Sequence, residues 1–145
     1  MGAIRIIEMD HIVLNVASVD RSLDFYSGIL GLKGERVEEF RAGAPGVPFA
    51  SVRLNEHTLI DLFPVKPGEA LQLPEAKDAR GKVRGNLEHF CFVVESGNFD
   101  ETIAVLKERG VNIHLGPLSR WGARGRTMSI YFLDPDGNEV EIRAY

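Results

Sequence analysis

Two histidines and two carboxylates recur at matching places in this chain of 145 residues. His11 and His89 each follow an apolar residue and an acidic residue, and each opens an apolar, strand-like segment. Asp61 and Glu141 can be matched by aligning the halves on Ser51 and Ser129, with two extra residues in the second turn. Imidazole and carboxylate are donors that suit divalent transition metals, and such sites support Lewis-acid or oxygen chemistry. The repeat therefore predicts a functional metal site made of two histidines and one or two carboxylates.

Each of these residues also has an ordinary structural explanation. A histidine at the start of a strand is commonly a hydrogen-bonded polar cap. Glu141 with Glu139 could form an exposed charge pair that protects a sheet edge, and Asp61 could bond to the backbone. The other two histidines, His57 and His114, have no partner in the repeat, and we expect both to be solvated.

An arginine-rich segment, residues 119–126, is unusual in a chain with 17 basic and 21 acidic residues. Its arginines are Arg120, Arg124 and Arg126, and two glycines lie among them. Guanidinium groups match the geometry of carboxylates and phosphates, so the segment is expected to be a flexible loop that binds an anionic substrate. A solvated surface loop is the alternative. Cys91 lies on the strand face of His89 and is expected to be a packing residue.

The composition limits the remaining classes of function. The formal net charge of −4 lacks the basic surface of a nucleic-acid-binding protein. One cysteine cannot form an internal disulfide and indicates a reducing compartment, and no apolar run approaches the ~20 residues of a membrane span. The expected protein is cytoplasmic, with no membrane or nucleic-acid partner. At this length the core needs no structural metal, so a bound metal would serve function.

The elements that must position these residues repeat as well. Ser18 or Asp20 can cap a first helix that ends at Gly31, and Ser96 or Asn98 can cap a second that ends at Gly110. Each helix follows a strand and precedes three more, so the unit is β-α-β-β-β, twice. The expected strands are 11–16, 34–40, 49–54 and 58–63 in the first half and 89–94, 111–115, 128–133 and 139–144 in the second.

A single domain of residues 1–145 is expected, with module 1 at about 6–64, a proline-containing linker at about 65–85 and module 2 at about 86–145. Neither module can close a core alone, so the two should pack together or with a second chain.

Two long stretches, DHIVLNVASVDRSLDFYSGILGL and MSIYFLDPDGNEVEI, resemble the vicinal oxygen chelate superfamily. That superfamily includes glyoxalase I, fosfomycin-resistance thiol transferases, extradiol dioxygenases, methylmalonyl-CoA epimerase and bleomycin-resistance proteins. The closing stretch is most similar to small glyoxalase-domain and virulence-associated members. The resemblance covers nearly the whole chain. It implies an α+β fold in which two paired β-α-β-β-β modules form a curved, cupped mixed sheet around a metal and ligand cavity.

The resemblance also implies a ligand set. His11, His89 and the glutamate of a G-N-x-x-E pattern, here Glu141, match the metal ligands of metal-dependent members. Asp61 falls near the position of a fourth ligand, Glu or Gln, in glyoxalase I and the epimerase, but it is one methylene shorter. Asp61 is thus a fourth ligand or a base. Without it, the three-ligand set resembles the dioxygenases and fosfomycin enzymes more. Zn, Fe, Ni, Co and Mn all suit these donors.

The expected activity is that of a divalent-metal-dependent lyase or isomerase of glyoxalase type. Its substrate would carry vicinal oxygens, and the metal would stabilise an enolate-like anion. The general base is Glu139, Asp61 or a displaced ligand carboxylate. The alternatives are an Fe(II) extradiol ring-cleaving dioxygenase, a metal-free drug- or metabolite-binding protein, and a fosfomycin-type thiol transferase. The family also implies a homodimer.

Overall fold

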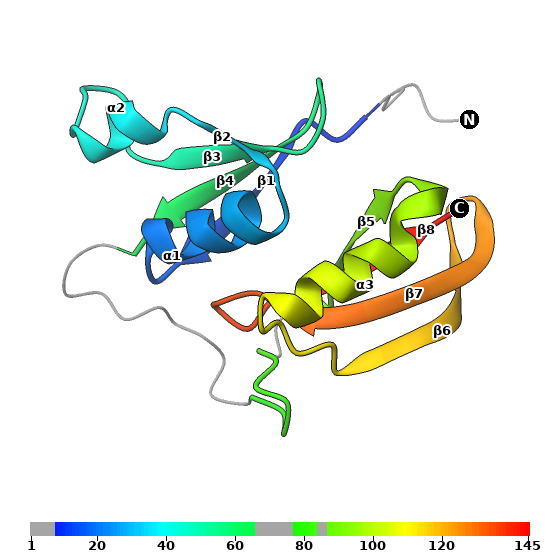
Figure 1. The fold of residues 1–145 in the computed structure, drawn as a ribbon. Coiled ribbons are helices and arrows are strands. Elements are labelled where there is room, and N and C mark those ends of the chain that lie inside the picture. The colour runs from blue at the N-terminus through cyan, green and yellow to red at the C-terminus, as the bar shows by residue number, and fades with distance from the viewer. Residues whose placement is uncertain (1–7, 66–76, 84–86) are drawn as a thin grey trace, which may run out of the picture. The chain divides into compact units, whose positions relative to one another are not determined.

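The computed structural model describes residues 8–65, 77–83 and 87–145, so most of the expected linker lies outside the described residues. The chain divides into two compact units between residues 71 and 72. Each unit contains one four-stranded mixed sheet (Figure 1). No described helix has the length and apolar character needed to cross a membrane.

Unit 1 contains the first β-α-β-β-β module, with strand order β1-β4-β3-β2. Its elements are β1 (His11–Val16), α1 (Val19–Leu23), η1 (Asp24–Ile29), β2 (Lys33–Glu35), α2 (Val37–Arg41), β3 (Ala50–Arg53) and β4 (Leu59–Pro64). β1 runs parallel to β4, while β3 is antiparallel to both of its neighbours.

Unit 2 repeats the plan, with strand order β5-β8-β7-β6. Its elements are β5 (Phe90–Val94), η2 (Ser96–Asn98), α3 (Phe99–Glu108), β6 (Leu115–Gly122), β7 (Gly125–Leu133) and β8 (Glu139–Ala144). β5 runs parallel to β8, and the other pairs are antiparallel. The predicted α+β fold of two β-α-β-β-β modules is confirmed.

The helices begin and end close to the predicted signals. Ser18 caps α1 by accepting a hydrogen bond from the Arg21 backbone N–H. The helix then continues as the π-helical turn η1 before Gly31, whose φ of +75° suits a C-terminal stop. Gly110 has the same φ after α3. Asn98 stands at the N-cap of α3 but makes no side-chain cap hydrogen bond.

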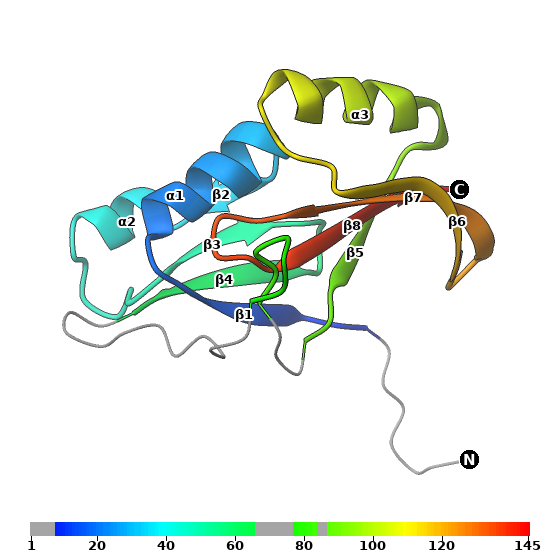
Figure 2. The ribbon, with the colours of Figure 1, turned by 90° about the horizontal axis from the view of Figure 1, so that it is seen from below.

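One face of each sheet is apolar and is covered by that unit's own helix (Figure 2). In unit 1 the buried set is Leu14, Val16, Val52, Ile60 and Leu62 with Phe25 and Tyr26 from the helix; in unit 2 it is Ile130, Phe132, Val140 and Ile142 with Leu106 from α3. Because side chains alternate along a strand, the ionisable residues are placed together on the opposite face of each sheet.

Two predicted strands differ from the structure. The expected strand 34–40 is only β2, because Arg36 adopts a left-handed φ of 56° and the chain then turns into α2. The expected strand 111–115 is replaced by β6, which begins at Leu115. The arginine-rich segment is therefore not a flexible loop: it belongs to a β6–β7 hairpin in which Gly122 pairs with Gly125.

The sheet register gives a simpler alignment of the halves than the two serines do. Asp61 pairs with Ser51, and Glu141 pairs with Tyr131, so each carboxylate lies ten residues after its partner. The turns before β4 and β8 also have equal lengths, because Arg53 pairs with Leu59 and Leu133 with Glu139. The match of Asp61 to Glu141 therefore stands without any insertion, whereas the match of Ser51 to Ser129 is wrong by two residues.

Candidate metal centre

Unit 2 brings His89 and Glu141 into direct contact. Glu141 lies on β8 opposite Cys91 of β5, and His89 lies two residues before Cys91 on the same face. The distance from His89 Nε2 to Glu141 Oε2 is 3.1 Å. The Glu141 side chain is 4% exposed and that of His89 is 34% exposed, so the carboxylate is buried while the imidazole reaches the surface. The Tyr131 ring packs edge-on against the imidazole, with 5.6 Å between ring centroids.

The second oxygen of Glu141 is held by Arg143. Nη2 and Nε of Arg143 donate to Oε1 at 2.6 and 3.1 Å. Burial by itself raises the pKa of the Glu141 carboxyl, but hydrogen bonds from Ser129 and Arg143 outweigh burial and lower that pKa. The result is an ionised carboxylate with one oxygen bonded to Arg143 and the other beside His89.

This donor pair fits a divalent ion. Two donor atoms that each lie about 2.1 Å from a shared ion, at roughly a right angle, are about 3 Å apart. The 3.1 Å separation of Nε2 and Oε2 is in that range.

Unit 1 places His11 and Asp61 on the matching strands, β1 and β4. The His11 Nδ1 lies 2.6 Å from Asp10 Oδ2, and this hydrogen bond raises the pKa of His11; the nearby Asp61 carboxylate adds to the effect. An imidazole that bonds a carboxylate through one nitrogen and leaves the other available is typical of metal-binding histidines. Asp61 is 7% exposed, and its Oδ1 accepts a 2.6 Å hydrogen bond from the Ser51 hydroxyl.

Glu139, the other acidic residue considered as a base, has both oxygens engaged. Oε1 accepts from Lys82 Nζ at 3.0 Å, while Oε2 lies 2.7 Å from His114 Nε2 and 3.6 Å from Arg80 Nη1. The His114 side chain is 6% exposed, so the expectation that His114 is solvated is wrong. His57, at 65% exposed, is solvated as expected.

Within the described residues, Glu88, His89 and Glu139 also form a group whose donor atoms all lie within 4.8 Å of one another. The Lys82 ammonium, however, bonds both Glu88 and Glu139. Burial favours a lower pKa for Lys82, but its two carboxylate partners outweigh burial and raise it, so Lys82 keeps its charge. The Lys82 ammonium therefore already supplies the positive charge that a metal ion would bring to Glu88 and Glu139.

The three arginines of the hairpin have different surroundings. All are exposed, and Arg120 and Arg126 lie on opposite faces of the hairpin, because Arg120 pairs with Thr127 and Arg126 with the next residue, Trp121. Burial raises the pKa of the Tyr131 hydroxyl. Arg120 lies near this hydroxyl and partly offsets the rise. Arg126 pairs with Trp121 across the hairpin.

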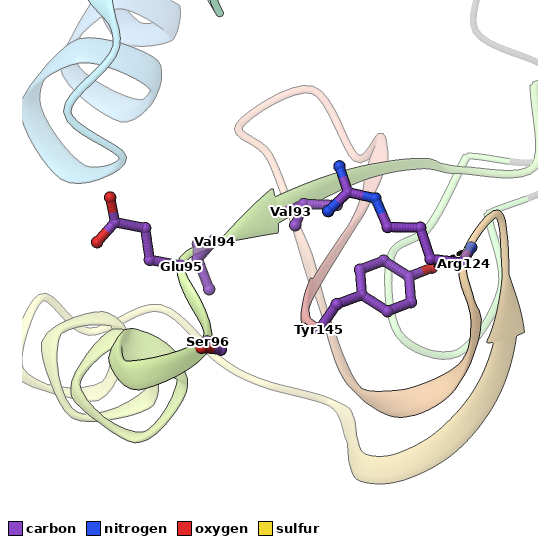
Figure 3. A pocket seen from close by; sticks show the side chains of 6 residues that line it. All are labelled: Val93, Val94, Glu95, Ser96, Arg124 and Tyr145. Atoms are coloured by element: carbon purple, nitrogen blue, oxygen red, sulfur yellow. Dashed lines mark hydrogen bonds between the residues drawn. The ribbon is translucent and has the colours of Figure 1, made fainter.

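Arg124 lines a pocket of about 340 Å³ with Val93, Val94, Glu95, Ser96 and Tyr145 (Figure 3). Its guanidinium lies over the Tyr145 ring, 5.3 Å from the centroid, while the Glu95 carboxylate points away from it. Val93 of β5 pairs with Arg143 of β8, two residue pairs along the sheet from the pair of Cys91 and Glu141. The pocket therefore begins two residues from Glu141 along the sheet.

Sequence reasoning missed Arg143 and Lys82. The signal for Arg143 was present, because Glu139, Glu141 and Arg143 alternate along one strand and so share one face. Lys82 gave no such signal, since its contacts with β8 span 57 residues of sequence.

Residues 8–142 match the Glyoxalase/Bleomycin resistance protein/Dioxygenase superfamily. The chain is 30% identical to the glyoxalase domain-containing protein RDO1 of Mycosarcoma maydis, over 94% of this chain and 68% of that protein.

Two further relatives have other descriptions. The virulence protein STM3117 of Salmonella typhimurium is 29% identical over 94% of this chain and 83% of its own length. Its crystal structure superimposes with a TM-score of 0.72 over 98% of this chain and 99% of that chain, at 27% identity. The metallothiol transferase FosB of Staphylococcus saprophyticus is 27% identical over 92% of this chain and 74% of its own length.

Proposed function

This chain belongs to the Glyoxalase/Bleomycin resistance protein/Dioxygenase superfamily, and on that premise we propose that it is a divalent-metal-dependent enzyme of glyoxalase type acting on a small molecule with vicinal oxygens. The observation that carries the proposal is the 3.1 Å approach of His89 Nε2 to Glu141 Oε2, with the second carboxylate oxygen already bonded to Arg143. A carboxylate held ionised beside an imidazole nitrogen is a donor pair for a divalent metal.

We assign His11, His89 and Glu141 as the residues that hold the ion. Support for His11 comes from its hydrogen bond to Asp10, which leaves Nε2 available as a donor atom. When bound, a divalent ion stabilises negative charge that develops on substrate oxygens. Its identity among Zn, Fe, Ni, Co and Mn stays open, since all of them accept these donors.

For lyase or isomerase chemistry we propose Asp61 as the base. In the described part of the chain, Asp61 accepts a hydrogen bond only from Ser51, at Oδ1, which leaves Oδ2 able to receive a proton from substrate. Glu139 is the weaker candidate, because Lys82 and His114 occupy its two oxygens. A ligand carboxylate displaced from the ion is the third possibility, and an Asp61→Asn variant that keeps the turnover rate of the wild type would favour it over Asp61.

An anionic part of the substrate would bind at the arginines. We favour Arg124 among Arg120, Arg124 and Arg126, because its guanidinium lines the pocket beside Tyr145. The apolar wall of Val93 and Val94 suits a small organic group next to the anion.

Metal analysis of protein purified without chelator tests the proposal. We expect about one divalent ion per chain, lost on dialysis against EDTA and regained on titration. His89→Ala and Glu141→Gln should each weaken the affinity at least ~10-fold, since the first removes a donor atom and the second replaces an anionic donor by a neutral one. His57→Ala is the matched control, because His57 is solvated. Protein that neither contains nor takes up a divalent ion would refute the proposal.

Thiol transfer is a second candidate, favoured by the similarity to FosB and by the Arg124 pocket. The metal-loaded protein would then consume a free thiol in the presence of fosfomycin, while showing no isomerase or lyase activity on 2-oxoaldehyde thiohemiacetals. Oxygen uptake with a panel of catechols after anaerobic loading with Fe(II) would instead indicate ring cleavage. Ligand binding that is unchanged in His11→Ala and His89→Ala would indicate a metal-free binding protein.

A further inference from the structure

The guanidinium of Arg143 is buried, and each of its three nitrogens donates a hydrogen bond. Its side chain is 4% exposed. Beyond the two bonds to Glu141 Oε1, Nη2 donates to Ser129 Oγ at 3.1 Å and to the Trp121 carbonyl at 3.2 Å, and Nη1 donates to the Tyr145 hydroxyl at 3.0 Å. These acceptors come from β6, β7, β8 and the residue that follows β8. The guanidinium is therefore fixed on several sides.

The backbone leaves space for this group at Gly122. A Cβ added to Gly122 would lie 1.5 Å from Arg143 Nη1 and 2.4 Å from the Tyr145 hydroxyl oxygen. Any side chain at this position would therefore displace the guanidinium from its acceptors. Gly122 thus makes the position of Arg143 possible, although a glycine within β6 weakens the strand.

The sister sheet shows that the fold itself does not require an arginine here. Asp61 is the counterpart of Glu141, and two residues later unit 1 has Phe63, which stacks on Phe49 with 4.3 Å between ring centroids. The Asp61 carboxylate is held by a neutral hydroxyl, that of Ser51. Replacing a buried ion pair by apolar residues is often neutral or stabilising, so stability alone does not explain Arg143.

We propose that Arg143 is a positioning residue that occupies Oε1 of Glu141 and so presents Oε2 alone, beside His89, as a single-oxygen ligand to the divalent ion. This inference rests on the proposed metal-dependent function. Without Arg143, Glu141 would be free to rotate, to bind through both oxygens or to turn away from His89. The hydrogen-bond partners of metal ligands typically change metal affinity by about 10–100-fold.

Co²⁺ titration of the full-length protein tests this role. The dissociation constant and the visible absorption spectrum of bound Co²⁺ are measured for the wild type, Arg143→Met and Gly122→Ala. Gly122→Ala changes no charge and no ligand, yet it displaces the guanidinium. Arg109→Met is the control for loss of an exposed arginine, and Gly97→Ala, where an added Cβ meets nothing within 4 Å, is the control for the glycine.

We expect Arg143→Met and Gly122→Ala to bind Co²⁺ about 10–100-fold more weakly and with an altered spectrum, while the two controls match the wild type. If Arg143→Met fails to fold, Gly122→Ala and its control still give the answer. Wild-type affinity and spectrum in folded Gly122→Ala would overturn the positioning role and leave the proposed function intact. A wild-type protein that binds no Co²⁺ or other divalent ion would overturn both.

Discussion

Two glutamates on one strand face have opposite surroundings, although only Val140 separates them. Glu141 keeps one oxygen beside His89, whereas Glu139 has both oxygens bonded, to Lys82 and to His114. The difference follows from their partners: the Lys82 and Glu139 side chains are 4% and 6% exposed and neutralise each other. Glu139 is therefore expected to contribute mainly to stability.

A double-mutant cycle on this buried pair measures that contribution. Lys82→Met and Glu139→Gln should each lower the free energy of unfolding by about 1–3 kcal/mol, because each removes one hydrogen-bond partner of a buried charge, while Glu88 still bonds Lys82 and His114 still contacts Glu139. The double variant should lose clearly less than the sum of the two, with a coupling of about 1–3 kcal/mol. Urea unfolding followed by circular dichroism gives all four values. Additive losses would contradict the pairing.

Asp78 predicts a specific response to acid. Hydrogen bonds from the Arg80 side chain, and then from the backbone N–H groups of Arg80 and Lys82, lower the pKa of Asp78 to about 2. A carboxyl with a lowered folded-state pKa stabilises the protein above its unfolded pKa of 3.8, and this contribution is lost as the pH falls from about 4 towards 2.

Asp78→Asn should therefore reduce stability at neutral pH and flatten the dependence of stability on pH in that acidic range. Unfolding free energies of the wild type and the variant between pH 2 and 5 check this. Parallel curves would show that Asp78 does not titrate with folding.

Hydrophobic periodicity and helix-end signals predicted those helices and strands that are determined by their own local sequence. The strands at 11–16 and 139–144 and the helix stops at Gly31 and Gly110 agree with the sequence expectation. The expected strand at 34–40 was wrong because Arg36 takes a left-handed conformation and α2 follows it; Gly34, Glu38 and Glu39 are also residues that strands disfavour. The prediction of a flexible loop at residues 119–126 was wrong because glycines such as Gly122 and Gly125 are typical of loops. Only their pairing in the structure shows that they belong to a hairpin.

The same distinction applies to the candidate site. His89 and Glu141 could be found from the repeat, since equivalent strand positions carry equivalent side chains. The contacts of Lys82 and His114 with Glu139 could not, because they depend on how distant segments pack against β8. Local pattern thus located the strands and the donors, whereas their hydrogen-bond partners required the tertiary structure.

Helix α3 depends on one fully buried side chain. Leu106 is 2% exposed, and it is the buried residue of this helix. Leu106→Ala should cost about 2–5 kcal/mol of unfolding free energy, from lost burial and the cavity that remains. The neighbouring Val105, 37% exposed, provides the control, and Val105→Ala should stay within about 0.5 kcal/mol of the wild type. Equal losses in thermal or urea unfolding would contradict this account of α3 packing.

For the whole molecule, each unit supplies part of the proposed donor set: His11 and Asp61 come from unit 1, and His89 and Glu141 come from unit 2. We predict a homodimer, and light scattering at micromolar concentration should give twice the 16.1 kDa mass of the chain. A monomeric mass would contradict this prediction.

Mixing His11→Ala with Glu141→Ala then identifies which chain provides the ligands. Recovery of about a quarter of the wild-type metal capacity after random exchange indicates a site shared by two chains, because one site in each mixed dimer would be intact. No recovery indicates that each site draws its ligands from one chain.

The equal lengths of the turns before β4 and β8 determine which changes these turns can tolerate. Residues 54–58 and 134–138 have unrelated sequences but the same length, between the pairs Arg53–Leu59 and Leu133–Glu139. A strand that slips by one residue exchanges its two faces, so an insertion in the second turn would turn Glu141 towards α3 and expose Ile142 instead. These turns should therefore tolerate many substitutions and almost no change in length.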